Sequence, residues 1–368
     1  MSTEPRWIFA DHTSVPGGGE LALVRYLQAT SLADVEVLTL EDGDVWNPLR
    51  EKSIPVTTLG PANALRTQLA LRAYVRRNRD AVFVANTMRM ALLLALARTR
   101  RTRIVYWVRD GLTDTYMSRA KQLLTRYVTL PRIAAAVANS QWTAGTVTAL
   151  EPAMPIRVVP SPSGIDPDTA TTSPRTLPTS GPVPIAFVAR ISEWKGPHIA
   201  IAAVDEVNRR AGHERVHLTV AGGTLFGENE FRDRFLAMVE ASSATDYLGH
   251  TDDVTGLFAS SAIMLHCSVT PEPFGQVVVQ AMNAGLVVIA TRGGGPSEII
   301  TPGVDGVLIE PDDPTLLADA LEALLDTPSG YSSMSRCAVK RAADYSDDTL
   351  VARLDRSLRE LSQIQKRR

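Results

Sequence analysis

The sequence contains few residues of the kinds that mark unusual protein classes. Only two of its 368 residues are cysteine, Cys267 and Cys337, so a scaffold held by disulfide bonds is excluded. The longest unbroken apolar run, residues 90–97, is too short to span a bilayer. The first residues lack the regions of a signal peptide. With 45% hydrophobic and 21% charged residues, whole-chain disorder is excluded, and we expect a soluble cytoplasmic protein.

Charge is distributed unevenly along the chain. Residues 1–160 hold 20 Lys and Arg against 13 Asp and Glu, a net of +7, whereas residues 161–368 hold 18 against 27, a net of -9. Arginines of the first half cluster at positions 72, 76, 77 and 79 and again at 98, 100, 101 and 103. Such clusters fit solvated helix ends, or a peripheral contact with anionic lipid or an anionic acceptor at the inner membrane face. Nucleic acid is disfavoured because the whole chain is slightly acidic.

Prolines divide the chain near its middle. Seven prolines fall within residues 160–184, and a helix or central strand cannot tolerate them. We therefore expect an N-terminal domain over residues 1–160, a linker over 161–184 and a C-terminal domain over 185–345. The polar helical segment at about 346–368 has no strand after it, and we expect it to pack back on the N-terminal domain.

Apolar runs alternate with helix-like segments in both halves. We expect strands at 7–10, 35–40, 54–59, 81–85, 103–108, 133–138, 156–159, 185–189, 217–221, 246–248, 263–266, 287–290 and 307–309. We expect helices at 20–30, 65–77, 88–97, 118–127, 197–211, 231–242, 274–284 and 314–325. Continuous Val, Ile and Ala strands between helices predict parallel sheets covered on both faces. The expected fold is α/β, with two doubly wound Rossmann-like domains that face a cleft.

One motif has the letters of a zinc site without the required geometry. His213-Glu214-Arg215-Val216-His217 matches H-E-x-x-H, which binds zinc when both imidazoles share a helical face. Gly212 is expected to end the preceding helix, and His217 opens a strand. The two imidazoles then cannot share a helical face, so we predict no metal site here.

Glycines and charged residues follow several predicted strands. Gly17-Gly18-Gly19 precedes a helix, where backbone N–H groups can bind an anion, although a structural turn fits equally well. Arg190 and Lys195 follow the first strand of the second domain, and two cations beside a helix start suit a diphosphate. Glu272 lies between two prolines in a loop after a strand, where a carboxylate can accept hydrogen bonds from sugar hydroxyls.

Taken in order, these motifs resemble glycosyltransferase family 4, the glycosyl transferases group 1, whose members are retaining enzymes with the GT-B fold. The matching elements are Gly17-Gly18-Gly19, Arg190…Lys195-Gly196, Glu272-Pro273-Phe274-Gly275…Gln280-Ala281-Met282…Gly285, Gly293-Gly294…Glu298 and Gly303…Asp305-Gly306. The resemblance is strong from about 185 to 312 and looser in the first domain. It implies transfer of a sugar from a nucleotide diphospho-sugar, most often a UDP-sugar, to a saccharide, glycolipid or natural-product acceptor, with no metal or other cofactor.

The resemblance also implies residue roles. Arg190 and Lys195 match the pair that holds the donor diphosphate and neutralises the leaving group, and Glu272 matches the glutamate that holds donor-sugar hydroxyls. Phe274 and Gly275 match backbone positions that close around the sugar and phosphates. The glycines at 17–19 match the loop next to the diphosphate and acceptor.

Two positions depart from the family pattern. Gln280 stands where relatives carry a second glutamate that contacts the ribose, and its neutral amide makes weaker hydrogen bonds than a carboxylate. Either the amide suffices, or the donor is unusual, or the protein is a weak or inactive relative. We favour the first explanation because the other donor residues are retained.

The second departure lies on the acceptor side. Many relatives place a histidine where this chain has Arg109 and Asp110, so the histidine's role does not transfer. Asp110 fits an acceptor contact or a helix cap equally well, and His12 is a further acceptor-side candidate. The alternatives to a transferase are a non-catalytic nucleotide-sugar-binding protein and a GT-B-like sugar-nucleotide epimerase.

Overall fold

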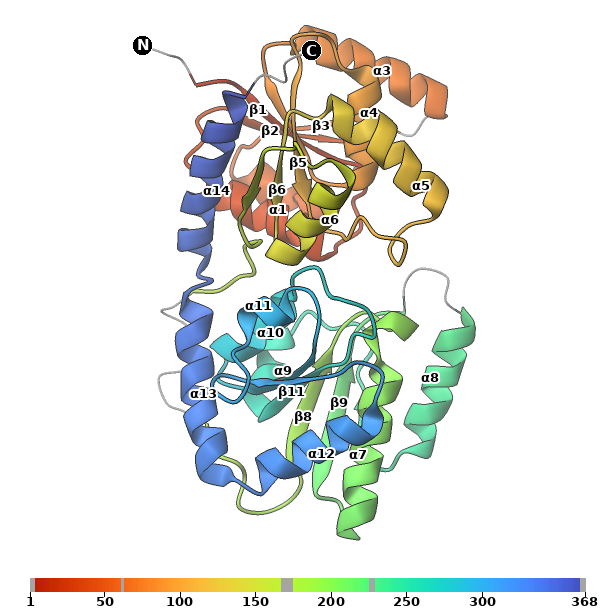
Figure 1. Ribbon diagram of the computed structural model, residues 1–368, viewed down its shortest axis with the longest axis vertical. Coiled ribbons are helices and arrows are strands. Elements are labelled where there is room, and N and C mark those ends of the chain that lie inside the picture. Colours follow the sequence, from red (N-terminus) through yellow and green to blue (C-terminus); the bar gives the residue numbers. More distant parts are fainter. Residues whose placement is uncertain (1–3, 61–62, 167–174, 225–228, 365–368) are drawn as a thin grey trace. The chain divides into compact units, whose positions relative to one another are not determined.

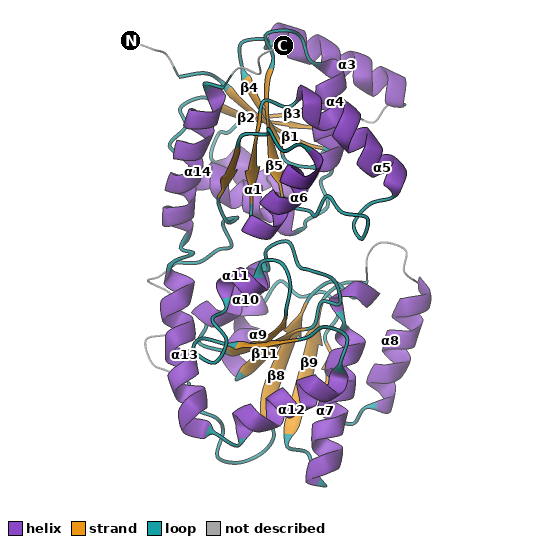
Figure 2. Ribbon diagram, in the orientation of Figure 1, coloured by secondary structure: helices purple, strands orange, loops and turns teal. Residues whose placement is uncertain are grey.

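The computed structural model describes residues 4–60, 63–166, 175–224 and 229–364, and it divides the chain into two compact units (Figure 1). The N-terminal unit comprises Met1–Gly164 together with Asp347–Arg368, and the C-terminal unit comprises Ile165–Ser346. Strands alternate with helices along both units (Figure 2). Within the described ranges, no helix combines the length and the apolar character needed to cross a bilayer.

The N-terminal unit is built on a seven-stranded parallel sheet in the order β3-β2-β1-β4-β5-β6-β7. Its strands are β1 (Trp7–Asp11), β2 (Val35–Thr39), β3 (Val56–Thr58), β4 (Val82–Ala85), β5 (Arg103–Val108), β6 (Ala135–Ala138) and β7 (Ile156–Val158). At the centre, Trp7 of the fully buried β1 pairs with Val35 on one side and Val82 on the other. The strand order reverses beside β1, and ligands bind doubly wound sheets at such a reversal.

Helices cover both faces of this sheet. They are α1 (Gly18–Ala29), α2 (Asn47–Glu51), α3 (Ala64–Arg77), α4 (Met88–Ala97), α5 (Arg119–Leu124), α6 (Gln141–Leu150) and α14 (Asp347–Ser362), with shorter turns η1 (Asp44–Trp46), η2 (Thr125–Thr129) and η3 (Leu130–Arg132). Leu71 of α3 and Leu94 of α4 pack in the core on one face. Leu23 of α1 and Leu354 of α14 pack in the core on the other.

The last helix of the chain belongs to the N-terminal unit, although the C-terminal unit precedes it in the sequence. Asp355 on α14 is 2% exposed. Its carboxylate accepts hydrogen bonds from Tyr26 Oη (2.6 Å), Thr30 Oγ1 (2.6 Å) and the Ser31 backbone N (2.8 Å). A buried carboxylate with several donors fixes the position of α14 on the sheet, because leaving it unpaired would be costly.

The C-terminal unit repeats the architecture with a six-stranded parallel sheet in the order β10-β9-β8-β11-β12-β13. Its strands are β8 (Val183–Val188), β9 (Val216–Ala221), β10 (Thr245–Tyr247), β11 (Ile263–His266), β12 (Val287–Thr291) and β13 (Val307–Ile309). Its helices are α7 (Pro197–Ala211), α8 (Asn229–Ala241), α9 (Val254–Ser260), α10 (Gln276–Asn283), α11 (Pro296–Ile299), α12 (Pro314–Leu325) and α13 (Pro328–Ala343), with η5 at Glu193–Lys195. Val204 and Leu321 pack on one face of the sheet and Met282 and Ala338 on the other.

The strand pattern expected from the sequence is confirmed. Every predicted range contains a strand, and the ends differ by no more than two residues. The ends of the predicted helices also differ by no more than two residues, except at residue 127. The helix expected over 118–127 stops at Leu124 and continues as the π-helical η2, and the one expected over 274–284 begins only at Gln276 because Gly275 has a φ of +94°.

The H-E-x-x-H letters fall on a turn between a helix and a strand, as predicted. Helix α7 ends at Ala211, Gly212 adopts a φ of +70° and His217 lies in β9. The Nδ1 of His217 lies 2.7 Å from Glu214 Oε1, and its Nε2 lies 2.9 Å from Asp246 Oδ2. Both ring nitrogens are therefore occupied by surface carboxylates.

Candidate donor-binding site

A tight loop carries the predicted phosphate-binding cations to the carboxyl end of β8. The chain leaves β8 at Val188, passes the exposed Arg190, forms η5 and enters α7 through Gly196. A Cβ on Gly196 would lie 2.1 Å from the carbonyl oxygen of Cys267, and its φ is +69°. Only glycine fits both constraints, so the loop can pack against the segment after β11 and place Lys195 beside it.

Lys195 and Glu272 are brought together by this packing. Lys195 Nζ donates to Glu272 Oε2 at 2.5 Å, and the two side chains are 15% and 14% exposed. The same ammonium lies 4.0 Å from the centre of the Trp194 ring. An ion pair so shielded from water is stronger than one on an open surface.

Two further residues face the same carboxylate oxygen, and the sequence reasoning did not single them out. His266, the last residue of β11, is 6% exposed, and its Nε2 lies 3.5 Å from Glu272 Oε2. Ser268 Oγ donates to that oxygen at 3.1 Å. Burial alone would raise the pKa of Glu272, but Lys195 and His266 outweigh it and hold the pKa below its ordinary range.

The positions of His266 and Ser268 in the sequence could have marked them as site residues. Both lie at the carboxyl end of a buried strand, where polar residues of these sheets meet ligands. Their convergence on Glu272 depends on a loop fold that residue spacing does not reveal.

The Glu272 loop is locked to the loop after β12. Gly294 has a φ of +70°, and a Cβ on it would lie 1.9 Å from the carbonyl oxygen of Glu272. The backbone N–H of Gly295 donates to that carbonyl at 2.7 Å. The carboxylate is thus held by its backbone as well as by its side-chain partners.

The remaining donor-side residues lie on or near α10. Phe274 is buried, with its ring 6.0 Å from that of Tyr345, so its side chain serves the core. Gly275 caps α10 in a left-handed conformation, and Gln280 is half-buried on the second turn of that helix. Within the described residues, no group of three or more His, Cys, Asp or Glu is arranged to hold a metal ion.

The acceptor-side candidates gather at the carboxyl ends of β1, β4 and β5 in the N-terminal unit. Arg109 donates to the carbonyl oxygen of Gly19 and to Asn86 Oδ1, and its guanidinium lies 3.8 Å from the centre of the Trp107 ring. Asn86 Nδ2 donates to Asp11 Oδ2 at 2.5 Å. This chain of contacts links the glycine loop to the sheet through one arginine.

The other acceptor-side candidates differ in their surroundings. His12 Nδ1 lies 2.9 Å from Thr87 Oγ1, and its backbone N–H donates to Asp11 at 2.6 Å. Asp110 is exposed. Of the glycines predicted to bind the donor, Gly17 caps α1, and Gly18 and Gly19 are the first residues of that helix. The sequence reasoning missed Asp11 and Glu20, two buried acids beside these loops.

Burial changes the ionisation of this cluster. It raises the pKa of Glu20 to about 7, with a smaller contribution from the charge of Asp11. It lowers the pKa of Arg109 to about 10, although nearby carboxylates oppose the shift. The N-terminal loops therefore combine a permanent cation with an acid that titrates near neutrality.

Comparisons with known proteins agree with these motifs in the C-terminal unit. Residues 170–341 match the family described as glycosyl transferases group 1. Glycogen synthase of Mycobacterium tuberculosis is 32% identical over 176 residues, 48% of this chain and 42% of that protein. D-inositol 3-phosphate glycosyltransferase of Corynebacterium diphtheriae is 28% identical over 166 residues, 44% of this chain and 38% of that protein. The match thus spans less than half the length of these curated relatives.

Solved structures match over nearly the whole chain. Anabaena HepE in complex with UDP and glucose has a TM-score of 0.83 at 23% identity, covering 97% of this chain and 100% of that one. Sucrose-phosphate synthase from Thermosynechococcus elongatus has a TM-score of 0.77 at 17% identity, covering 97% and 99%. The two parallel sheets with their helices are the GT-B fold.

Proposed function

We propose that the protein transfers a sugar from a nucleotide diphospho-sugar to a saccharide, glycolipid or natural-product acceptor, with retention of configuration and without a metal. The donor that we expect is a UDP-sugar. The observation that carries this proposal is the shielded Lys195–Glu272 pair at the carboxyl end of the sheet in a group 1 glycosyltransferase domain. HepE, whose fold this chain shares, has been solved with UDP and with UDP-glucose.

The donor diphosphate is assigned to Arg190 and Lys195. Negative charge grows on the leaving diphosphate as the anomeric bond breaks, and fixed cations stabilise that charge. The N-terminus of α7 begins directly after this loop and adds backbone N–H groups of favourable orientation. In this proposal, the Lys195 ammonium leaves the Glu272 carboxylate and pairs with a phosphate oxygen when the donor binds.

Glu272 is assigned to holding the donor sugar. Its depressed pKa keeps it ionised, so it accepts hydrogen bonds from sugar hydroxyls and cannot act as a general acid near neutral pH. Its pairing with Lys195 also argues against a role as nucleophile. We therefore favour front-face attack, in which the acceptor oxygen bonds to the anomeric carbon as the leaving phosphate accepts the acceptor proton.

Calorimetric titration with UDP, GDP and ADP, with and without magnesium, tests the donor assignment. We expect UDP to bind in the micromolar range, a binding free energy of about -8 kcal/mol, with equal affinity in the presence and absence of magnesium. Arg190→Ala and Lys195→Ala should each weaken binding at least about tenfold, since each removes a charge-assisted contact. Arg336→Ala, an exposed arginine on α13, is the matched control and should bind like the wild type.

Gln280 supports a second candidate, a nucleotide-sugar-binding protein with weak or no activity. Gln280→Glu separates the two. Little change in transfer to an added acceptor would show that the amide suffices, whereas a large gain would indicate a degenerate site. Release of an epimerised nucleotide sugar without transfer would instead favour the epimerase alternative. Absence of binding by all three nucleotides would contradict the donor assignment altogether.

A further inference from the structure

One side of the N-terminal unit is strongly basic. Helices α3, α4 and α5 lie beside one another there (Figure 1), and residues from α3, α4 and η3 share the core on one face of the sheet. The segments α3, α4, α5, η2 and η3 hold nine Lys and Arg and no Asp or Glu. Asp80, after the end of α3, lies 3.6 Å from Arg79. We call the surface of α3, α4, α5, η2 and η3 the basic face.

Helix α3 presents leucines and arginines along one stripe. Leu65, Leu69, Arg72 and Arg76 are exposed and spaced by four, three and four residues, so they share the outward side of the helix. Leu65 is 70% exposed and Leu69 is 58% exposed. The opposite side packs on the sheet. Exposed leucines beside arginines suit contact with anionic lipid, because the membrane interface stabilises apolar side chains and attracts cations.

Helix α5 and the turn η2 after it add exposed apolar side chains to this face. Helix α5 buries none of its residues. Leu123, Leu124 and Tyr127 are 56%, 40% and 63% exposed. Six of the twelve large hydrophobic side chains that are exposed among the described residues lie on the basic face. Such clustering indicates an interaction site, because scattered exposed residues would be ordinary.

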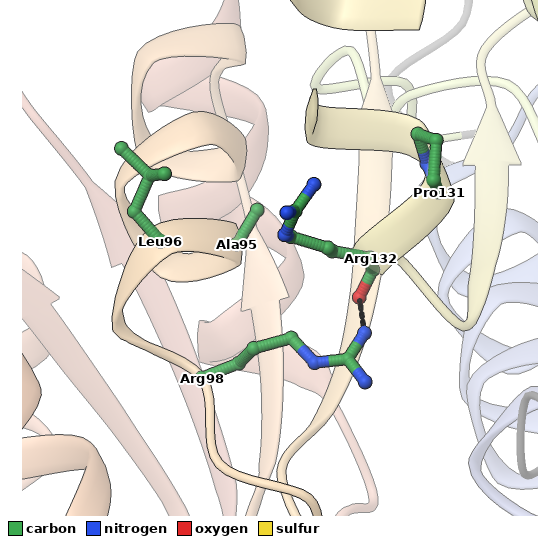
Figure 3. A pocket seen from close by; sticks show the side chains of 5 residues that line it. All are labelled: Ala95, Leu96, Arg98, Pro131 and Arg132. Carbon is green, nitrogen blue, oxygen red and sulfur yellow. Dashed lines mark hydrogen bonds between the residues drawn. The ribbon is translucent and has the colours of Figure 1, made fainter. Parts of the chain in front are cut away.

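Arginines also converge on two hollows at the amino edge of the sheet. Arg76, Arg79, Thr99, Arg100 and Arg101 line a shallow hollow of about 300 Å³. A second hollow is lined by Ala95, Leu96, Arg98, Pro131 and Arg132 (Figure 3). There, Arg98 donates to the carbonyl oxygen of Arg132 at 2.9 Å. Guanidinium groups gathered in this way repel one another, and an anion between them would remove that repulsion.

We propose that the basic face docks the protein on a bilayer that contains anionic lipid. Lipid phosphates occupy the hollow lined by Arg76, Arg79, Arg100 and Arg101. The guanidinium groups offer positive charge and planar sets of N–H donors, which suit a phosphate. The exposed leucines and Tyr127 enter the interfacial region, where apolar side chains are stabilised. A soluble phosphate would use the arginines but would leave the leucine stripe without a partner. The combination therefore favours a lipid surface.

Vesicle co-sedimentation of the full chain, with no nucleotide sugar present, tests this proposal independently of transfer activity. We expect binding to vesicles of phosphatidylcholine mixed with phosphatidylglycerol, little binding to phosphatidylcholine alone, and weaker binding as salt rises. Arg100→Gln with Arg101→Gln should weaken binding about 25-fold, since each arginine near a charged membrane contributes about fivefold. Arg336→Gln with Arg356→Gln removes the same charge from exposed sites on α13 and α14 and should bind like the wild type.

A second pair of variants tests the apolar part. Leu65→Ser with Leu69→Ser should weaken vesicle binding about tenfold, because two interfacial side chains lose their burial. Leu248→Ser with Leu316→Ser, which changes exposed leucines of the C-terminal unit, should leave it unchanged. Equal binding to neutral and anionic vesicles, binding to neither, or equal losses in the test and control pairs would each overturn the proposal. Circular dichroism of every variant checks that a loss of binding is not a loss of folding.

Discussion

At the residue scale, the donor site converges on a single oxygen atom. Glu272 Oε2 receives the Lys195 ammonium at 2.5 Å and the Ser268 hydroxyl at 3.1 Å, and it faces His266 at 3.5 Å. When Lys195 pairs with the donor diphosphate, the Ser268 hydroxyl and the close fit of Gly294 against the Glu272 backbone still hold the carboxylate in place for the donor sugar. This preorganisation stabilises the ionised form and fixes the remaining lone pairs toward the ligand.

Glu272→Gln separates sugar binding from nucleotide binding. The amide has nearly the same shape but loses the charge that strengthens bonds to hydroxyl groups. We expect UDP to bind within about threefold of wild type, whereas turnover of the nucleotide sugar falls about a hundredfold, the equivalent of two charge-assisted hydrogen bonds. Calorimetry with UDP and a transfer assay measure the two quantities. A parallel loss of both would mean that Glu272 holds the nucleotide rather than the sugar.

The buried Glu20 gives stability a dependence on pH. Burial raises its pKa to about 7 in the folded chain, above the ordinary value of 4.5. The acid therefore costs no stability below pH 4.5, and the cost grows as pH rises toward 7. We expect the free energy of unfolding of Glu20→Gln, relative to wild type, to rise across this window by up to about 3 kcal/mol. Urea titrations at several pH values measure it.

The exposed Glu51 at the end of α2 supplies the control for that prediction. Glu51→Gln should differ from wild type by the same small amount at every pH. If Glu20→Gln behaves in the same flat way, the acid is ionised in the folded chain, and burial does not control its titration.

At the element scale, the attachment of α14 rests on Asp355. Four donor groups from the end of α1 and the loop after it meet this buried carboxylate. Asp355→Ala leaves Tyr26 Oη and its neighbours unpaired, and we expect a loss of about 3 kcal/mol in the free energy of unfolding. Asp348→Ala, on an exposed position of the same helix, should cost less than about 0.5 kcal/mol. Urea denaturation compares them, and similar losses would contradict an anchoring role for Asp355.

Elements differed in how far the sequence alone predicted them. Strands such as β5 and β11 were predicted to the residue, because buried parallel strands are continuous apolar runs. Helices α2, α9 and α11 were not predicted. They have 5, 7 and 4 residues, which is too few for the spacing of apolar residues to show a helical period. Helix α6 was missed for a different reason. Its small residues, with Thr and Gly among them, give little contrast between its faces.

The candidate site was likewise predicted only in part from the sequence. Lys195 and Glu272 were predicted because cations and carboxylates in loops between a strand and a helix are conspicuous, and the chain folds them together. His266 and Ser268 were missed because their partner, Glu272, is fixed by the fit of Gly294 against the loop backbone. The acceptor-side arginine was predicted, but its contacts with Gly19 and Asn86 depend on three strands meeting at one edge of the sheet.

At the scale of the whole molecule, the chain consists of two units with separate cores, and the side chains proposed for the phosphates and the sugar, those of Arg190, Lys195 and Glu272, lie in the second. Two cores of this size need not unfold together. We expect a calorimetric scan to show two transitions, of which UDP raises only one, by about 2.7 kcal/mol of stability at a hundredfold excess over Kd. Asp355→Ala should lower the other transition, because α14 belongs to the N-terminal unit. Lys195→Ala should reduce the UDP effect to about half or less, since tenfold weaker binding leaves only a tenfold excess, and it should not move the transition of the N-terminal unit. An equal shift of both transitions by UDP would mean that the two units unfold as one.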